Sequence, residues 1–373
     1  MKLRLLVAAL ALALPAPALA ATPPRVDAAA YLVENASTRE VVAGRAAGKP
    51  LPIASLTKMM TVLLALERVR PDDVVTVGAR AAAVGESSIE LRPGDRLTVR
   101  DLIKASLIQS ANNAAEALAE YVSRGDVPAF VALMNRRARE LGLTDTHFVR
   151  PDGLDAPGHV SSARDVTRLA EILMHKTEAR TIVRERDDTI AGGRRLHTWN
   201  DLLGRFPGLI GVKTGHTAAA GWCEVAAARA TGFTIYATIL GSPNRDRRNR
   251  DLAALLRFGL SQYRVETVIG ARGPYAHAAL GYGRAPLALV AAAPLRHVVR
   301  IGRPLTERVV TATAVTLPVR RGQRLGEVRV YDGARLLGSR PLVASRSVER
   351  PGLAGRVGWY ARRTVHHLWA FVT

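Results

Sequence analysis

The residues best suited to chemistry begin with a serine and a lysine three positions apart. Ser55 and Lys58 stand at the head of an apolar run that meets no helix breaker before Pro71. On a helix, residues three apart share one face, so the amine lies within reach of the hydroxyl. A serine beside an amine is a nucleophile with its own base, and a helix start favours the developing alkoxide. A lone Ser-x-x-Lys pair occurs by chance in many proteins, so partners elsewhere in the chain must support it.

Two later motifs supply such partners. Ser110-Ala111-Asn112 falls at the break between two predicted helices, where a short loop can aim a hydroxyl and an amide into a cleft. Lys213-Thr214-Gly215 lies at the end of a predicted strand, where lysine supplies positive charge and glycine permits close approach of a substrate backbone. Only six of the 53 basic residues are lysines, and two of them, Lys58 and Lys213, belong to the first and third motifs. The three motifs in this order carry more weight than any one alone.

Helices around an antiparallel sheet are expected to position these motifs. Apolar periodicity predicts the Ser55 helix and a helix capped by Thr98 or Asp101 that runs to about Ser110. Further helices are predicted over 113–122, 129–141, 162–174 and 251–263. Strands are predicted over 28–35, 39–42, 209–215, 222–229 and 233–240, with a strand, turn and strand over 86–99. The predicted fold class of residues 25–262 is therefore α+β.

The N-terminus and the charge set the compartment and the partners. Residues 1–20 combine a basic start, an apolar run over 5–14 and an Ala-x-Ala site, which predicts a signal peptide and export from the cytoplasm. The net charge of +21 comes mostly from 47 arginines, a bias that genome composition can explain. An anionic membrane or cell wall is the favoured partner class. No nucleic-acid-binding motif is seen, and the lone Cys223 indicates a chain held together without internal disulfides.

The chain is divided into a catalytic domain over 21–262, a β-domain over 263–346 and a tail over 347–373. Short strands over 297–301, 309–317, 327–331 and 335–337 predict the small all-β domain, with Asp332-Gly333 as a hairpin turn. The tail predicts an amphipathic helix that lies in a membrane interface. Its predicted apolar side is Leu353, Val357, Tyr360, Val365, Leu368, Phe371 and Val372, opposite Arg356, Arg362, Arg363, His366 and His367. A helix packed on its own β-domain is the alternative.

The three motifs and their surroundings resemble the low-molecular-weight penicillin-binding proteins, the serine-type D-alanyl-D-alanine carboxypeptidases. The resemblance runs through nearly the whole chain after residue 20. It includes residues 109–115 around the second motif, 211–217 and 220–223 around the third, and the loop segments 151–155 and 159–163. It implies a penicillin-binding/β-lactamase-like transpeptidase fold, a β-domain and an amphipathic tail. It implies no metal and no cofactor.

The resemblance also implies residue roles. Ser55 would attack the penultimate D-alanine carbonyl of a peptidoglycan pentapeptide, and Lys58 would take the serine proton. Ser110 would relay a proton to the leaving D-alanine, and Asn112 would hold the substrate amide. The terminal carboxylate would be bound by Lys213 and Thr214, and Lys213 would also keep Lys58 deprotonated. Gly215, His216, Thr217 and Arg248 complete the expected substrate-binding set, with the backbone N–H groups of Ser55 and His216 as oxyanion hole.

Several assignments stay open. Arg248 sits among other arginines, so a solvated basic turn is an equal alternative, and His216 is expected to contribute its backbone only. Asp152, Asp155 and His159 are expected to shape a loop. A class A β-lactamase would need a glutamate base, and the 151–165 loop has none. A D,D-endopeptidase on cross-links and a non-catalytic muropeptide or β-lactam sensor remain as alternatives. β-Lactams are expected as covalent inhibitors, and the expected location is the periplasm or the extracytoplasmic face of the bacterial membrane.

Overall fold

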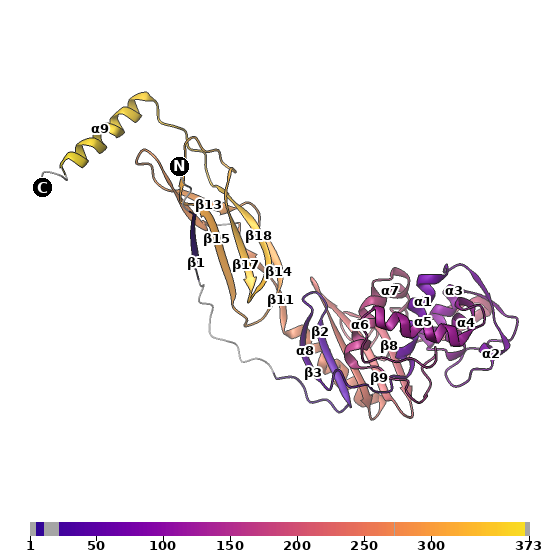
Figure 1. Cartoon of the computed structure of the whole chain (residues 1–373). Helices are drawn as coiled ribbons and strands as arrows, with labels where there is room; N and C mark the ends of the chain where they lie inside the picture. The colour runs from indigo at the N-terminus through magenta and orange to yellow at the C-terminus, as the bar shows by residue number, and fades with distance from the viewer. Residues whose placement is uncertain (1–4, 11–21, 272, 370–373) are drawn as a thin grey trace. The chain divides into compact units, whose positions relative to one another are not determined.

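The computed structural model describes residues 5–10, 22–271 and 273–369, with the side chains of 5–10, 363 and 365–369 outside the description. The chain divides into two compact units. One comprises residues 21–262, and the other comprises residues 263–373 together with 1–20. Figure 1 shows the helices gathered in the first unit and long strands in the second.

A five-stranded antiparallel sheet forms the centre of the first unit. Its order is β3-β2-β10-β9-β8. The strands are β2 (Ala30–Asn35), β3 (Glu40–Arg45), β8 (Leu209–Thr217), β9 (Gly221–Ala230) and β10 (Phe233–Ser242). Every residue of β2 is buried, as expected for a strand covered on both faces. The sheet therefore lies between two layers of helix rather than facing water.

Two helices cover opposite faces of this sheet. Thr167 of α6 (Ala163–Met174) bonds to Thr238 of β10 through their hydroxyl groups at 2.6 Å. On α8 (Arg245–Ser261), Gly259 packs so closely that a side chain there would meet Ile235 of β10. Residues 235 and 238 differ in parity along the strand and so point to opposite faces. The helix α6 thus covers one face, and α8 covers the other.

The remaining helices of this unit pack around α1 (Lys58–Arg68), whose first eight residues are all buried. A short 3₁₀ helix, η1 (Ala54–Thr57), leads into it. Thr98 and Asp101 form a reciprocal capping box at the start of α3 (Val99–Lys104), as the sequence predicts. The other elements are α2 (Ala79–Ala82), π-helix η2 (Ala105–Gln109), α4 (Asn112–Val122), α5 (Val127–Glu140), α7 (Thr177–Ile182) and η3 (Ala191–Gly193), with strand pairs β4 (Val74–Thr76)/β5 (Arg96–Thr98) and β6 (Asp187–Ile190)/β7 (Arg194–His197).

Two predicted elements differ from the structure. The first predicted strand of 86–99 is wrong, since only Arg96–Thr98 is strand there. The Asn113 side chain instead bonds both main-chain groups of Ile89, and this side-chain pairing replaces a strand ladder. The helix predicted over 251–263 begins at Arg245, because the Asn244 side chain accepts a hydrogen bond from the Arg247 N–H and caps it earlier.

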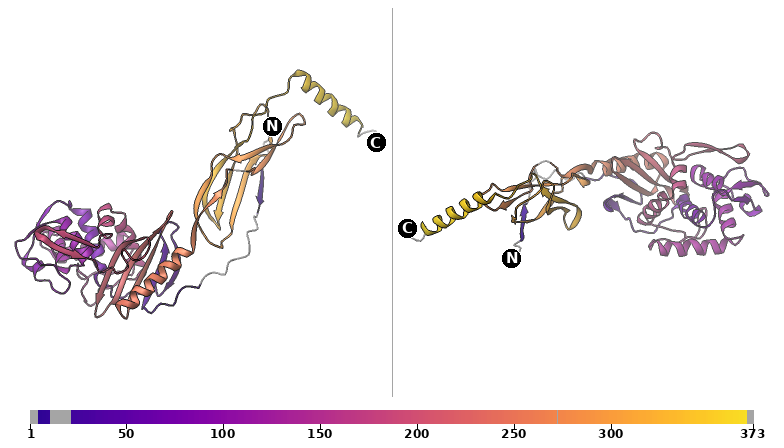
Figure 2. Two further views of the ribbon diagram at one scale, coloured as in Figure 1. Left: turned by 180° about the vertical axis from the view of Figure 1, so that it is seen from behind. Right: turned by 90° about the horizontal axis from the view of Figure 1, so that it is seen from above.

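The second unit is built from strands, as predicted, and Figure 2 shows them from two further sides. Its seven-stranded sheet has the order β1-β15-β17-β18-β13-β12-β16, and a separate pair joins β11 (Tyr263–Ile269) to β14 (Leu295–Arg300). The sheet strands are β1 (Leu5–Leu10), β12 (Ala276–Leu280), β13 (Leu287–Ala291), β15 (Leu305–Ala312), β16 (Ala314–Val315), β17 (Arg324–Asp332) and β18 (Arg335–Ala344). The strand β1 lies within the predicted signal peptide and forms one edge of this sheet, where it pairs antiparallel with β15.

The tail forms the helix α9 (Leu353–Trp369). Its apolar side chains Leu353, Val357 and Tyr360 are 75%, 66% and 57% exposed, so the β-domain does not bury them. Trp359 contacts the Tyr282 ring, with ring centroids 5.4 Å apart. Val365, Leu368, Phe371 and Val372 of the predicted apolar side lie outside the residues whose side chains are described. Among the described residues, helices that combine the length and hydropathy needed to cross a bilayer are absent.

Candidate active site

The nucleophile candidate Ser55 lies in η1, one turn before Lys58. Ala54 immediately before it has a positive φ of 50°, an uncommon backbone conformation for a residue with a side chain. The Ala54 carbonyl accepts a hydrogen bond from the Thr57 hydroxyl at 2.9 Å. The Ser55 side chain lines a cavity of about 260 Å³ between η1, the end of η2 and β8. The turn that exposes Ser55 is thus held from behind by buried neighbours.

Lys58 is fully buried and donates three hydrogen bonds. Its Nζ lies 2.8 Å from Ser55 Oγ, 2.7 Å from Asn112 Oδ1 and 2.7 Å from the Asp152 carbonyl oxygen. The three acceptors come from η1, α4 and the loop after α5. Two of these contacts join residues that the sequence motifs predict to act together. The third partner, Asp152, was expected only to shape a loop.

Burial is the main cause that sets the charge of Lys58. It lowers the pKa of Lys58 to about 7, while the Asp152 carboxylate opposes the change and the Arg150 guanidinium adds to it. Arg150 is thus a like charge near Lys58 in addition to Lys213, which the sequence predicts. Burial, and then the Lys58 ammonium, hold the pKa of Lys213 well below its usual value, and this repulsion between the two lysines is mutual. A substantial fraction of Lys58 is neutral at pH 7.

The side chains of Ser110 and Lys213 are in direct contact beside the cavity. Lys213 Nζ donates to Ser110 Oγ at 2.7 Å and to the Thr214 carbonyl oxygen at 2.8 Å. Ser110 ends η2 in the left-handed conformation, with φ 63°. This conformation breaks the helix between η2 and α4, as the sequence predicts. The hydroxyl of Ser110 accepts from Lys213 and so keeps its own proton available for another acceptor.

Asn112 links the second motif to the segment that follows α2. Its Nδ2 donates to the Gly85 carbonyl oxygen at 3.0 Å while its Oδ1 accepts from Lys58. Its main-chain N–H donates to the Ser87 carbonyl oxygen at 2.6 Å. Glu86 and Ser87 are thereby held against the cavity, which they line. Neither was predicted, because neither belongs to a motif.

The third motif places Gly215 against the nucleophile's backbone. A side chain at position 215 would lie 2.9 Å from the Ser55 nitrogen and 3.1 Å from the Ala54 side chain. The glycine was predicted to admit a substrate backbone. The structure shows that it is first needed for β8 to approach η1. Thr214 and His216 line the cavity, whereas Thr217 does not.

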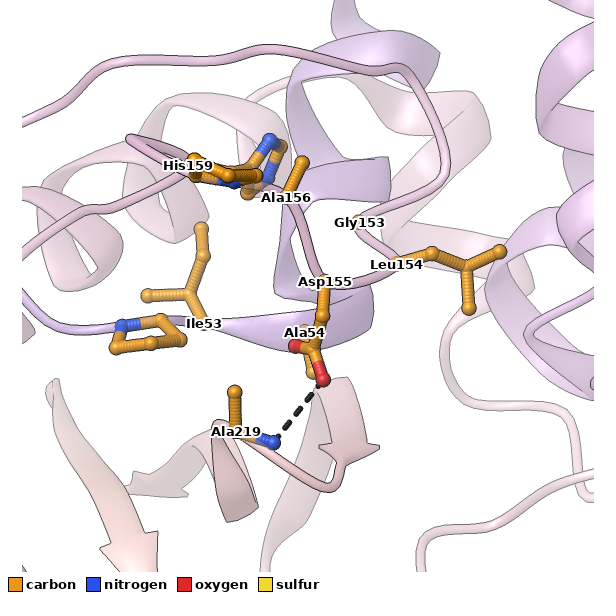
Figure 3. A pocket seen from close by; sticks show the side chains of 10 residues that line it. Ile53, Ala54, Gly153, Leu154, Asp155, Ala156, His159 and Ala219 are labelled. Atoms are coloured by element: carbon orange, nitrogen blue, oxygen red, sulfur yellow. Dashed lines mark hydrogen bonds between the residues drawn. The ribbon is translucent and has the colours of Figure 1, made fainter.

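The loop over 151–159, between α5 and α6, forms hydrogen bonds with both β8 and η1. The Asp155 carboxylate accepts from the Thr217 hydroxyl at 2.6 Å and from the Ala219 N–H at 3.0 Å, a contact visible in Figure 3. Thr217 therefore fixes the loop to the strand end. His159 Nδ1 accepts from the Val149 N–H, so its Nε2 donates to the Thr57 hydroxyl at 2.7 Å. Burial lowers the pKa of His159 to about 4, which keeps it neutral. Asp155 and His159 thus hold the loop in place, whereas Asp152 also contacts Lys58.

Arg248 is part of the cavity rather than a solvated turn. It begins the second turn of α8, is 1% exposed and lies over the Trp222 ring at 5.5 Å. Its Nη2 donates to Asp201 Oδ2 at 3.0 Å. The aromatic residues Trp199 and Trp222, also unpredicted, complete the wall. Glu224 is an acidic residue within the mostly apolar strand predicted over 222–229. Because acidic residues are rarely buried without a partner, it indicated a charged site near Arg248, and this signal was missed.

Comparison with known proteins gives a consistent picture. The family model described as "D-alanyl-D-alanine carboxypeptidase" (Peptidase_S11) matches residues 18–244. D-alanyl-D-alanine carboxypeptidase DacC of Escherichia coli is 33% identical over 93% of this chain and 90% of its own length. DacD of Salmonella typhimurium is 32% identical over 94% of each chain.

Solved structures give the same result. Penicillin-binding protein 6B from Escherichia coli is 28% identical, covers 87% of this chain and 98% of its own, and superposes with a TM-score of 0.67. The ampicillin-bound penicillin-binding protein D2 from Listeria monocytogenes is 31% identical and covers 64% of this chain and 100% of its own, with a TM-score of 0.58. These likenesses agree with the predicted fold. The chain therefore belongs to the D-alanyl-D-alanine carboxypeptidase family of low-molecular-weight penicillin-binding proteins.

Proposed function

We propose that this chain is a serine D-alanyl-D-alanine carboxypeptidase that removes the terminal D-alanine from peptidoglycan pentapeptide stems. The observation that carries this function is the Lys58 amine, which is buried and contacts both Ser55 Oγ and Asn112 Oδ1. A neutral amine at 2.8 Å from a hydroxyl is positioned to take its proton. Family membership gives the substrate class, since the relatives are named for it.

In the acylation step, the Ser55 Oγ attacks the penultimate D-alanine carbonyl and its proton passes to Lys58. The backbone N–H groups of Ser55 and His216 stabilise the oxyanion, a contribution of about 3 kcal/mol for one such donor. The peptide C–N bond then breaks, and the proton held by Lys58 passes through Ser110 to the leaving amine. Lys58, neutral again, accepts a proton from the water that attacks the acyl-enzyme, and it returns this proton to Ser55 Oγ as the ester bond breaks. β-Lactams acylate Ser55 by the same route.

Substrate is held at the end of the cavity where cationic and hydroxyl groups gather. Lys213, Thr214 and Arg248 bind the terminal carboxylate, and Asn112 holds the substrate amide. Gly215 and His216 present the edge of β8 to the substrate backbone. Thr217 acts through the Asp155 contact rather than by touching substrate. These assignments need no metal and no cofactor.

The enzyme works outside the cytoplasm at the membrane surface. Residues 1–20 direct export and are removed. The tail then associates with the membrane through the apolar side chains that α9 leaves exposed, together with its arginines. The location is the periplasm or the extracytoplasmic face of the bacterial membrane.

A labelling and turnover experiment tests this function. Ser55→Ala should abolish both covalent labelling by a fluorescent penicillin and D-alanine release from a pentapeptide, because the nucleophile is missing. Persistent labelling of the variant would refute Ser55 as nucleophile. Labelling of the unaltered protein without D-alanine release would indicate a sensor. Faster cleavage of a cross-linked dimer than of the pentapeptide would indicate an endopeptidase.

A further inference from the structure

Glu224 is a buried charged group that the acylation steps above do not use. It lies in β9 directly opposite Thr214 of β8, so both side chains lie on the sheet face that α8 covers. Its side chain is fully buried. Neither carboxylate oxygen has a hydrogen-bond partner among the described residues. A carboxylate in this environment is held there by a neighbouring charge or loses its own charge.

That neighbouring charge is Arg248. Its Nε lies 3.1 Å from Glu224 Oε2, while its Nη2 donates to Asp201. The same guanidinium lines the cavity that contains Ser55. Arg248 thus contacts two carboxylates, those of Glu224 and Asp201. A substrate carboxylate would be the third anion at this guanidinium.

The charged groups that face Glu224 come from three elements. Arg248 and Arg245 belong to α8, Lys213 to β8, and Asp201 to the loop after β7. Burial tends to raise the pKa of Asp201, but hydrogen bonds from Arg245 and Asn249 hold it below the usual range, so Asp201 stays ionised. Burial raises the pKa of Glu224 to about 7 against the pull of Arg248. An additional anion nearby raises it further, because like charges favour the protonated form.

We propose that Glu224 is a positioning residue for Arg248 that takes up a proton from solvent when a substrate carboxylate binds. Its ionised form neutralises Arg248 in the empty site, and its protonated form frees the guanidinium for the ligand. The inference rests on the proposed function, since it requires a peptide with a free terminal carboxylate. It follows that KM for such a peptide rises as pH is raised through 7, whereas kcat follows the titration of Lys58.

Proton uptake can be measured directly. Ser55→Ala protein, which binds without turnover, is titrated with a D-Ala-D-Ala peptide by calorimetry in two buffers of different ionisation enthalpy. The measurement is repeated with Ser55→Ala/Glu224→Gln, in which the amide keeps the side-chain shape but cannot titrate. At pH 7, close to the pKa of Glu224, the second protein should take up about half a proton less per peptide. Lys213 interacts with Glu224, so this difference reports the Glu224–Lys213 pair, and the infrared measurement below assigns the proton to the carboxyl group.

A matched control is Glu116→Gln in the same Ser55→Ala background. Glu116 is also buried, has a raised pKa caused by burial and pairs with Arg80 at 2.8 Å, but it does not line the cavity. This control should keep the full proton uptake. Equal proton uptake with and without Glu224 overturns the inference while leaving the proposed function intact. No peptide binding by the Ser55→Ala protein, together with no penicillin labelling of the unaltered chain, overturns both.

A second measurement detects the protonated carboxyl group itself. Infrared difference spectra of Ser55→Ala protein, recorded with and without the peptide at pH 7, should gain a band of a buried protonated carboxyl group. That band should disappear in the Glu224→Gln protein. Its absence in the Ser55→Ala protein would overturn the inference.

Discussion

At the scale of single residues, the chemistry depends on how Lys58 is desolvated. The Ser-x-x-Lys spacing accounts for the 2.8 Å contact with Ser55, but the spacing cannot give the lysine its acidity. Burial does so, and the buried position requires acceptors for all three ammonium protons. Those acceptors are Ser55, Asn112 and the main chain of Asp152. The base is therefore prepared by contacts that come from three separate stretches of chain.

The pH profile of acylation follows from this environment. Lys58 accepts the serine proton only when neutral, so the acylation rate should rise with pH through about 7, its pKa. The Asp152 carboxylate favours the ammonium form, so Asp152→Asn should lower the pKa of Lys58 and move the rise to lower pH by roughly one unit. The main-chain contact with Lys58 remains in this variant. Penicillin acylation rates measured across the pH range check the shift.

Asp72→Asn serves as the control for that shift. Asp72 also pairs with an arginine, Arg100, at 2.9 Å, but its side chain is 83% exposed. Its profile should superimpose on that of the unaltered enzyme. If the Asp152→Asn profile superimposed as well, the carboxylate would have no part in tuning Lys58.

The residues predicted from motifs and those that were missed differ in a physical way. Ser55, Lys58, Ser110, Asn112 and Lys213 stand at fixed spacings, and the structure brings all five together. The missed residues act through their charge on residues that are far away in the sequence. They are Arg150, Asp201 and Glu224, and no local spacing indicates which chain segments will meet. The contribution of Arg150 was missed for the same reason, since only the fold brings this further like charge near Lys58.

At the scale of elements, the site depends on how closely the loop over 151–159 approaches η1. Gly153 has φ 85°, and a side chain there would lie 2.1 Å from the Ala54 carbonyl oxygen. The Asp152 carbonyl that binds Lys58 immediately precedes this glycine. Close packing at one position thus fixes both the turn that presents Ser55 and the acceptor for its base.

Gly153→Ala should therefore disrupt both stability and acylation. Gly158→Ala is the matched control, since Gly158 lies in the same loop with φ 77° but its nearest neighbour would be 3.9 Å away. Both variants have the same backbone strain, whereas only Gly153→Ala adds a clash, which should cost about 2 kcal/mol more. Urea unfolding measures the difference, and penicillin labelling should slow in Gly153→Ala alone. Equal stability losses in the two variants would show that the loop can shift to accommodate the added methyl group at position 153 without lowering stability further.

Sequence periodicity predicted most of the elements, and its failures have local causes. The helices α5 and α6 bury one side, so their apolar spacing is visible in the sequence. The first eight residues of α1 and of α4 are all buried, and these helices show as apolar or alanine-rich runs. The start of α8 is a charged run, Arg245–Arg250, and no apolar spacing marks it. Only Arg248 of this run is buried, and it pairs with Asp201 and Glu224. The segment before β5 was misread because Asn113, which holds it, lies 24 residues farther along.

At the scale of the whole molecule, a catalytic unit is followed by a β-domain and a helix, whose described side chains Leu353, Val357 and Tyr360 are mostly exposed. Residues 21–262 contain every residue assigned to chemistry, and the second unit contributes none of them. The tail is therefore separable in function from the site. Its exposed side chains argue against the alternative of a helix packed on its own domain.

Removal of residues 347–373 should release the protein from anionic vesicles and leave D-alanine release from small peptides unchanged.

A sharper comparison adds one negative charge at neighbouring positions of α9. Val357 is 66% exposed on the apolar side, and at Gly358 an added side chain would meet nothing within 4 Å. Val357→Glu should weaken vesicle binding at least about tenfold, because it removes apolar area that would enter the membrane and adds a negative charge. Gly358→Glu changes the charge equally, so a loss of the same size in vesicle sedimentation would assign the binding to electrostatics alone. No vesicle binding by the full chain would exclude the tail as an anchor.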